Sequence, residues 1–172
     1  MSENNNDLYK EQLPEDEFIN SEPSFDNETP ESIEKKIKLT HQFENGVSWF
    51  YWIAALSILN TILYLVGSGW NFIVGLGVTQ IIDDIAITTE GASRLLAIAI
   101  SLGIAALFFA LGLLLKRNRK NGIFIFGIVA YGLDSLLFIL IQDWISIAFH
   151  AFAIYGFYRG IKANNELKRL ES

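Results

Sequence analysis

Four long apolar runs determine what this chain can fold into, because each is long enough to cross a lipid bilayer as a helix. A bilayer span takes roughly 20 helical residues. The runs cover residues 47–66, about 92–115, 123–141 and about 144–161. None of them contains proline, which would interrupt the helical hydrogen bonds. The sequence therefore predicts an all-α integral membrane protein with four transmembrane helices.

The stretch between the first and second runs is apolar but interrupted. Gln80, Asp83 and Asp84 lie inside it. A pair of aspartates near the centre of a spanning helix costs several kcal/mol. We therefore interpret residues 69–90 as a re-entrant or interfacial segment that packs against the four spans instead of crossing the membrane as a fifth.

The distribution of basic residues tests the number of spans. They form three clusters: before the first run, between the second and third, and after the fourth. The clusters are Lys35, Lys36 and Lys38; Lys116, Arg117, Arg119 and Lys120; and Arg159, Lys162, Lys168 and Arg169. Four spans place all three clusters on one side, whereas five would divide them. Since basic residues concentrate in the cytoplasm, we predict both termini there. In general appearance the chain resembles small multi-pass proteins of bacterial inner membranes, and this resemblance implies a bacterial cytoplasmic (inner) membrane.

The N-terminal part has a different composition from the rest. Twelve acidic and four basic residues give residues 1–46 a charge of −8, whereas seven acidic and nine basic residues give residues 47–172 a charge of +2. The first 28 residues are acidic and poor in apolar side chains, which is typical of disorder. A helix start is visible at Thr29-Pro30-Glu31, and Asn45-Gly46 predicts its end.

These observations predict four regions in chain order. They are a disordered acidic tail (1–28), a juxtamembrane amphipathic helix or linker (29–46), the transmembrane domain (47–163) and a cytoplasmic C-terminal tail (164–172). The lipid bilayer is the first expected partner. Two features could bind a protein partner: the acidic N-terminal tail, and the small-residue face formed by Gly156 and Gly160. Such GxxxG faces let two helix backbones approach closely, within one chain or between chains.

Several classes of function are excluded or disfavoured by composition. The chain has no cysteine, so it has no disulfide framework and no thiolate metal site. It has two histidines, too few for a multi-histidine zinc site. The pI of about 4.9 argues against a nucleic-acid partner. No phosphate-binding or dinucleotide-binding glycine motif is present, and we expect no cofactor.

Polar residues inside the spans are the most informative feature. Asp134 and His150 are equally distant in sequence from Gln142, where the third and fourth runs turn around. In an antiparallel hairpin, such residues lie at the same depth, and we predict that they are partners. Asn60 and Ser101 lie at a similar depth on the first two runs. An ionisable residue within a membrane normally faces the bundle interior and is paired.

The same spacing predicts a polar cavity that opens to the outer side. Its mouth would be formed by four further residues near the outer ends of the helices. They are Gln80, Asp83, Asp84 and Asp143. Three interpretations of the buried polar residues stay open: structural hydrogen bonds that fix helix register, an ion, proton or small-molecule site, and a metal site. The sequence indicates no particular metal.

The functional hypothesis that follows is a small multi-pass membrane protein of binding or accessory type. The alternative is a minimal transporter, or an ion- or proton-binding protein, that uses Asp134 and His150. A third hypothesis is an intramembrane metal-dependent hydrolase, with Asp83, Asp84 and this pair as ligands to an activated water. The nucleophile and metalloprotease motifs of known intramembrane proteases are missing, which disfavours an enzyme but leaves the question open.

Overall fold

The described part of the chain is helical, as the sequence predicts. A computed structural model describes residues 29–66 and 75–172, and in these ranges the chain forms five α-helices. They are α1 (Pro30–Leu65), α2 (Gly77–Thr88), α3 (Ala92–Asn118), α4 (Asn121–Leu140) and α5 (Trp144–Leu170). The predicted tail, residues 1–28, and the beginning of the predicted re-entrant segment, 69–74, lie outside the described residues.

Three of the described helices, α1, α3 and α4, are long and apolar enough to cross a membrane. This is the composition expected of a multi-pass membrane protein. Helix α5 is not among them. Its 27 residues give it a length of about 40 Å, but His150, Arg159 and two tyrosines lower its mean hydropathy. The fourth span therefore stays a prediction.

Helix α1 begins where the sequence predicts and ends much later. The backbone N–H of Ser32 donates a hydrogen bond to the Thr29 hydroxyl oxygen at 3.3 Å, which caps the first turn. The predicted end near Asn45-Gly46 is wrong, because the helix continues through both residues to Leu65. Glycine costs a helix about 1 kcal/mol relative to alanine. Burial of Gly46 against another helix offsets that cost.

That other helix is α5, and glycines form the contact on both sides. A Cβ atom on Gly46 would lie 2.8 Å from the Cα of Gly160, so only glycine allows this approach. One turn earlier on α5, Gly156 lies under the indole ring of Trp49. The predicted Gly156/Gly160 face is therefore used within the chain. This leaves the acidic tail, outside the described residues, as the predicted route to a protein partner.

Helix α5 also extends beyond its predicted end and includes most of the predicted C-terminal tail, 164–172. Asn164 is fully buried, and its side-chain amide donates to the carbonyl oxygen of Arg119 at 2.7 Å. The guanidinium of Arg119 binds Glu171 at 2.8 Å. These contacts fasten the end of α5 to the α3–α4 connection, which explains why the segment is an ordered helix.

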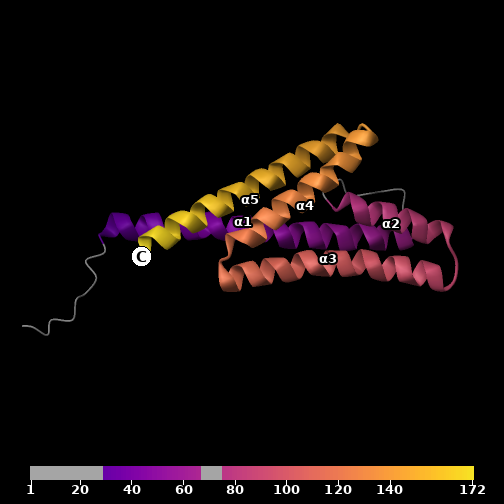
Figure 1. The fold of residues 1–172 in the computed structure, drawn as a ribbon, viewed down its shortest axis with the longest axis horizontal. Helices are drawn as coiled ribbons and strands as arrows, with labels where there is room; N and C mark the ends of the chain where they lie inside the picture. The colour runs from indigo at the N-terminus through magenta and orange to yellow at the C-terminus, as the bar shows by residue number, and fades with distance from the viewer. Residues whose placement is uncertain (1–28, 67–74) are drawn as a thin grey trace, which may run out of the picture. The chain divides into compact units, whose positions relative to one another are not determined.

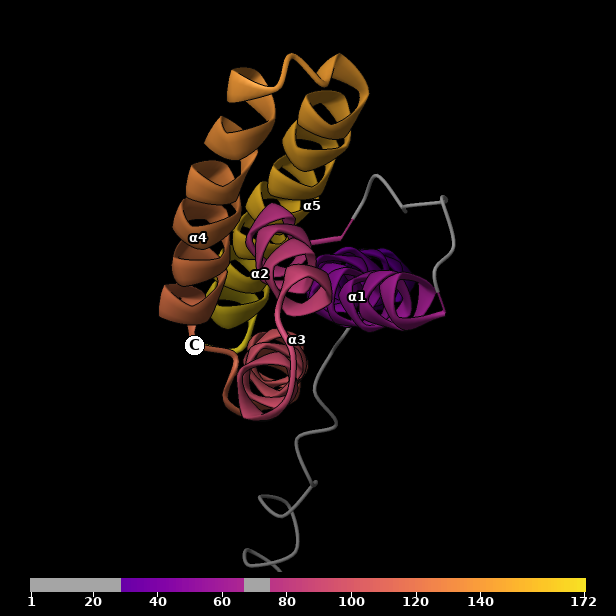
Figure 2. The same ribbon diagram turned by 90° about the vertical axis from the view of Figure 1, so that its right-hand side faces the viewer.

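Within residues 34–172, α4 and α5 form an antiparallel hairpin that turns at Gln142, the predicted pivot. Gln142 has a φ of 57°, and the N–H of Asp143 donates to the carbonyl oxygen of Phe138 at 3.0 Å. Helix α3 runs beside α1 in the opposite direction (Figure 1). Figure 2 looks along these two helices and shows α2 beside α1, between α3 and the hairpin.

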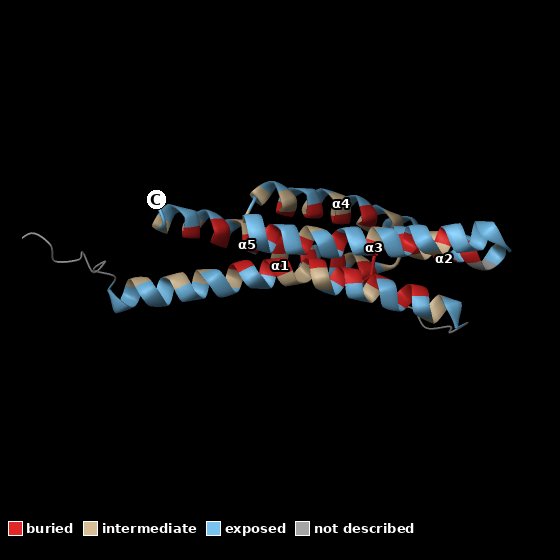
Figure 3. Cartoon of the chain, turned by 90° about the horizontal axis from the view of Figure 1, so that it is seen from below, coloured by how far each residue is buried: buried red, intermediate tan, exposed pale blue. Residues whose placement is uncertain are grey.

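Aromatic side chains fill the core where α1, α3, α4 and α5 meet. Phe50 of α1 is fully buried, and its ring centre lies 4.6 Å from that of Phe157 and 6.1 Å from that of Phe108. The buried residues form stripes along the helices, with exposed residues on the opposite faces (Figure 3). Many of the exposed residues are apolar, such as Leu133, which is 61% exposed. An apolar outer surface of this extent is typical of contact with lipid.

Candidate functional site

Helix α2 begins in the interior of the bundle and runs outward along α1. The backbone N–H of Leu76, just before the helix, donates to the Ser57 hydroxyl oxygen at 2.9 Å. One turn further along α1 and two turns further along α2, the Thr61 hydroxyl donates to the Asp83 carboxylate at 2.8 Å. The two helices therefore run in the same direction. The start of α2 lies beside the middle of the apolar part of α1.

A helix that starts in the interior has to satisfy its first N–H groups there. These groups have no partner within the helix, and each unsatisfied one costs several kcal/mol in hydrocarbon. Leu76, at the N-cap position, has no side-chain oxygen to accept them. Asp134 of α4 supplies the cap: its carboxylate accepts the N–H groups of Gly77 at 2.7 Å and Val78 at 2.9 Å. A negative charge there also complements the helix dipole.

Asp134 is also hydrogen-bonded to His150, as the spacing around Gln142 predicts. The distance between the imidazole Nε2 and Asp134 Oδ2 is 3.0 Å. The other ring nitrogen, Nδ1, lies 2.7 Å from the carbonyl oxygen of Ser146. A carbonyl oxygen only accepts, so Nδ1 carries a proton. A hydrogen bond between Nε2 and Oδ2 then needs a proton on one of these two atoms, either on a protonated imidazole or on a carboxylic acid.

Aromatic rings enclose the pair. Tyr131 stacks on the imidazole of His150, with ring centres 3.9 Å apart and an angle of 16° between the planes. Phe138 covers a second side, at 4.9 Å. His150 is fully buried and Asp134 nearly so. These rings hold the imidazole in one orientation and keep water away from its contact with Asp134.

The two other predicted cluster residues reach the same place. The Asn60 side chain is fully buried and faces Gly75, where its Nδ2 would lie 2.5 Å from an added Cβ atom. The Ser101 hydroxyl donates to the carbonyl oxygen of Thr79 at 3.3 Å. Residues of α1, α3 and α4 therefore meet the start of α2, and His150 of α5 joins them through Asp134. We call this group the α2 anchor: the backbone of residues 75–79 with Ser57, Asn60, Ser101, Asp134 and His150.

The backbone of α2 is the part of the anchor that sequence reasoning missed. The equal depth of the four polar side chains predicts that they cluster, but not what they bind. The sequence signal that could have indicated this close backbone packing was the pair of glycines on either side of Leu76, Gly75 and Gly77. A Cβ atom on Gly77 would lie 2.7 Å from the Phe138 ring, so glycine permits the close approach.

The four residues of the predicted outer mouth do not form one group. Asp83 is buried, and its Oδ1 has no hydrogen-bond partner among the described residues. Asp84 accepts a hydrogen bond from the Tyr64 hydroxyl at 2.6 Å. Gln80 is half-buried on α2, and Asp143 lies at the start of α5.

The ligands of the hydrolase hypothesis are also separated. Asp83 follows Gly77 by six residues, which is about 9 Å along a helix axis. The Asp134–His150 pair lies at the Gly77 end. In the ranges that the structure describes, no three histidine, aspartate or glutamate side chains gather as a metal ion would require.

Asp143 has a structural role that pH should reveal. Its carboxylate accepts hydrogen bonds from the Ser146 hydroxyl at 2.5 Å and the Ser146 N–H at 3.1 Å, which caps α5. These bonds, the hydroxyl first, hold the pKa of Asp143 below its ordinary value. We expect Asp143→Ala to lower the free energy of unfolding at pH 7 by about 1 kcal/mol.

The lowered pKa fixes the sign of the pH dependence. The contribution of the Asp143 carboxylate is complete above the ordinary pKa of an aspartate, and it is lost as the pH falls through the lowered value. Thermal unfolding in detergent should therefore show a stability gap between wild type and Asp143→Ala at neutral pH that narrows in strong acid. Asp143→Asn, which keeps a capping oxygen, is the control. A gap that is constant with pH would exclude this role.

No protein-family model, curated protein or solved structure matches this chain. The α2 anchor can hold a proton between two titratable groups, and it satisfies the backbone of a helix that starts inside the bundle.

Proposed function

We propose that this chain is a four-span integral membrane protein of binding or accessory type, with both termini in the cytoplasm of a bacterium. The fourth span is α5, which is long enough and antiparallel to α4. Helix α2 is the re-entrant element, because it starts beside Ser57 and ends near the outer end of α1. The hydrogen bonds from Thr61 and Tyr64 to α2 support this path.

The observation that carries the binding proposal is that the α2 anchor is fully engaged. Asp134 accepts two backbone N–H groups and also meets the imidazole. His150 uses both ring nitrogens. Transport through this pair would require its groups to exchange partners, which would leave the N–H groups of Gly77 and Val78 unsatisfied in an apolar interior. We therefore assign the pair to holding α2 in place.

The second candidate is a proton- or ion-binding protein. The observation that favours it is the 3.0 Å contact between two titratable side chains, Asp134 and His150. Histidine and carboxylate pairs within a membrane are frequent in proton relays. The two candidates make opposite predictions about flux.

The flux experiment uses the purified protein in liposomes that contain a pH-sensitive dye. For the binding proposal, we expect proton flux under a pH gradient to equal that of protein-free liposomes. The Asp134→Asn variant should not change it. Asp143→Asn, outside the anchor, is the matched control. Flux in wild type that disappears in Asp134→Asn, but not in Asp143→Asn, would replace the binding proposal with the second candidate.

The binding proposal also needs a positive result at the outer end of α2. A photo-cross-linking residue at Ile85, which is exposed, should give an adduct of one defined mass in native membranes. The control position is Leu133, which is equally apolar and exposed on α4. Adducts that are absent at both positions, or identical at both, would count against a specific partner at α2.

The proposed topology can be tested with single cysteines, since the natural chain has none. We expect a membrane-impermeant maleimide to label Glu90→Cys in intact cells, because the α2–α3 connection lies outside. Ser172→Cys should react only after permeabilisation. Both residues are exposed, so burial does not limit labelling. The reverse pattern, or both positions on one side, would overturn the four-span topology.

A further inference from the structure

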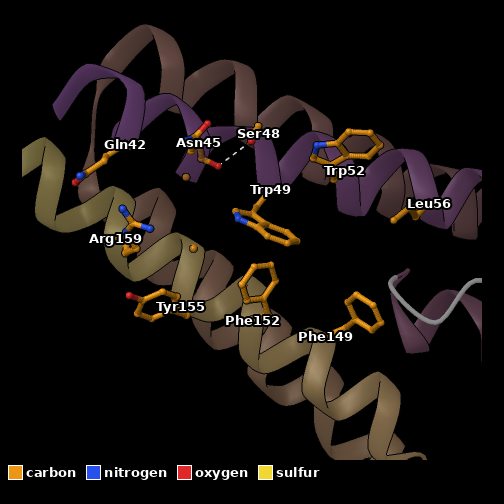
Figure 4. Close-up of a pocket in the computed structure, with 12 residues that line it drawn as sticks. Gln42, Asn45, Ser48, Trp49, Trp52, Leu56, Phe149, Phe152, Tyr155 and Arg159 are labelled. Carbon is orange, nitrogen blue, oxygen red and sulfur yellow. Dashed lines mark hydrogen bonds between the residues drawn. The ribbon is translucent and has the colours of Figure 1, made fainter. Parts of the chain in front are cut away.

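A groove of about 490 Å³ lies between α1 and α5. The two helices meet closely at Gly46 and Gly160 and separate from there, and the groove occupies the wedge between them (Figure 4). The side chains that line it change from polar to apolar along its length. Its two walls are formed on α1 by Gln42, Asn45, Gly46, Ser48, Trp49, Trp52 and Leu56, and on α5 by Phe149, Phe152, Tyr155, Gly156 and Arg159.

The polar end carries positive charge. The guanidinium of Arg159 lies 6.0 Å from the Tyr155 ring centre, and no ion pair of this residue is formed within the described residues. A second hollow adjoins the groove through shared residues and adds Lys162. Glu166 also borders that hollow, but Arg169 binds its carboxylate at 3.2 Å. The positive charge of Arg159 and Lys162 is therefore available to an anion.

The other end is a wall of aromatic rings. Trp49 and Phe152 pack edge to face, with ring centres 5.3 Å apart, and close the floor between the helices. Trp52 is 60% exposed and borders the opening. Leu56 and Phe149 lie furthest from the polar end (Figure 4). This wall offers an apolar, open-sided surface of the kind that an acyl chain can cover.

The proposed topology gives the groove a depth in the membrane. The apolar run of α1 starts at Val47 and that of α5 ends near Ile161, both on the cytoplasmic side. Arg159 therefore lies at the level of the lipid headgroups, and the aromatic wall lies within the hydrocarbon. The groove therefore has positive charge at the level of the phosphate groups and apolar surface at the level of the acyl chains, which matches the structure of a phospholipid.

We propose that this groove binds one anionic phospholipid of the cytoplasmic leaflet, with its phosphate at Arg159 and an acyl chain along the aromatic wall. The inference uses the proposed orientation of the chain but neither the flux nor the cross-linking result. An anionic headgroup is favoured over a zwitterionic one because two basic residues face it and the nearby glutamate is already paired. A basic residue near a membrane surface favours an anionic lipid by about fivefold.

Tryptophan fluorescence gives a direct test in reconstituted vesicles. The chain has four tryptophans, and the background Trp70→Phe/Trp144→Phe leaves two, which both line the groove. The probes are phosphatidylglycerol and phosphatidylcholine with brominated acyl chains, mixed into unbrominated phosphatidylcholine. We expect half-maximal quenching at a fraction of phosphatidylglycerol that is lower by about fivefold or more. Arg159→Gln should reduce this preference, and Arg159→Gln combined with Lys162→Gln should remove it.

The control is Arg117→Gln, which removes an exposed charge at the cytoplasmic end of α3, outside the groove. It should keep the preference, and Arg159→Lys should keep most of it if Arg159→Gln does not fold. Equal quenching by the two lipids in the wild-type groove would overturn the proposal. So would an equal loss in Arg117→Gln and Arg159→Gln, or the absence of quenching by either lipid, which would indicate a protein segment in the groove. The cysteine labelling described above reports separately on the topology.

Discussion

Replacing Asp134 with leucine is expected to lower the free energy of unfolding by about 3–5 kcal/mol, because it removes one partner from a buried pair. The imidazole of His150 would lose the acceptor at its Nε2. The N–H groups of Gly77 and Val78 would lose their cap at the same time. Unfolding of the purified protein in mixed micelles, followed by circular dichroism, measures the change.

Asp134→Asn is the matched control for this variant. The amide keeps one oxygen of similar position, so it can still accept a hydrogen bond from the start of α2 or from the imidazole. We expect a loss clearly smaller than that of the leucine variant. If Asp134→Leu cost less than about 1 kcal/mol, Asp134 could not be the cap of a buried helix start.

Replacing Gly46 with leucine should have the second large effect, a loss of about 3 kcal/mol or more, because the α1–α5 contact has no space for a side chain. Its Cβ atom would lie 2.8 Å from the Cα of Gly160 and 3.1 Å from the Phe124 ring. A backbone atom cannot rotate away, so the two helices would have to separate. The same unfolding measurement in micelles tests this prediction.

Gly103→Leu is the matched control, since Gly103 also lies inside a long helix, α3. A Cβ atom there would meet nothing within 4 Å. Leucine has the higher helix propensity, so this variant should be neutral or slightly stabilising. Equal losses in the two variants would show that the Gly46 effect is not caused by the close contact with α5.

The sequence predicted the features that depend on the length of an apolar run and on residue spacing within one helical hairpin. The apolar runs correspond to long helices, and the turn at Gln142 follows from the break between the third and fourth runs. Because that turn is short, equal spacing was enough to predict the contact between Asp134 and His150. Local chemistry also predicted the start of α1, where Thr29 caps the first turn.

Contacts between distant segments account for what was missed. Gly46 has a low helix propensity, which is typical of residues at helix ends. Only its packing against Gly160 explains why α1 continues. Likewise, the polar residues of the spans predict a cluster or cavity. That their partner is the backbone at the start of α2 depends on where residues 75–79 lie in three dimensions. Asn164 gives no sequence signal of its bond to Arg119, which holds the end of α5.

We propose that Asp134 and His150 act as one structural unit that anchors α2. A double-mutant cycle of Asp134→Leu and His150→Leu, measured by unfolding in mixed micelles, tests it most directly. Residues in contact should couple by about 0.5 kcal/mol or more. We predict that the double variant loses less unfolding free energy than the sum of the losses of the two single variants, because it leaves no unpaired polar side chain of the pair behind. Strict additivity of the two losses would contradict the claim.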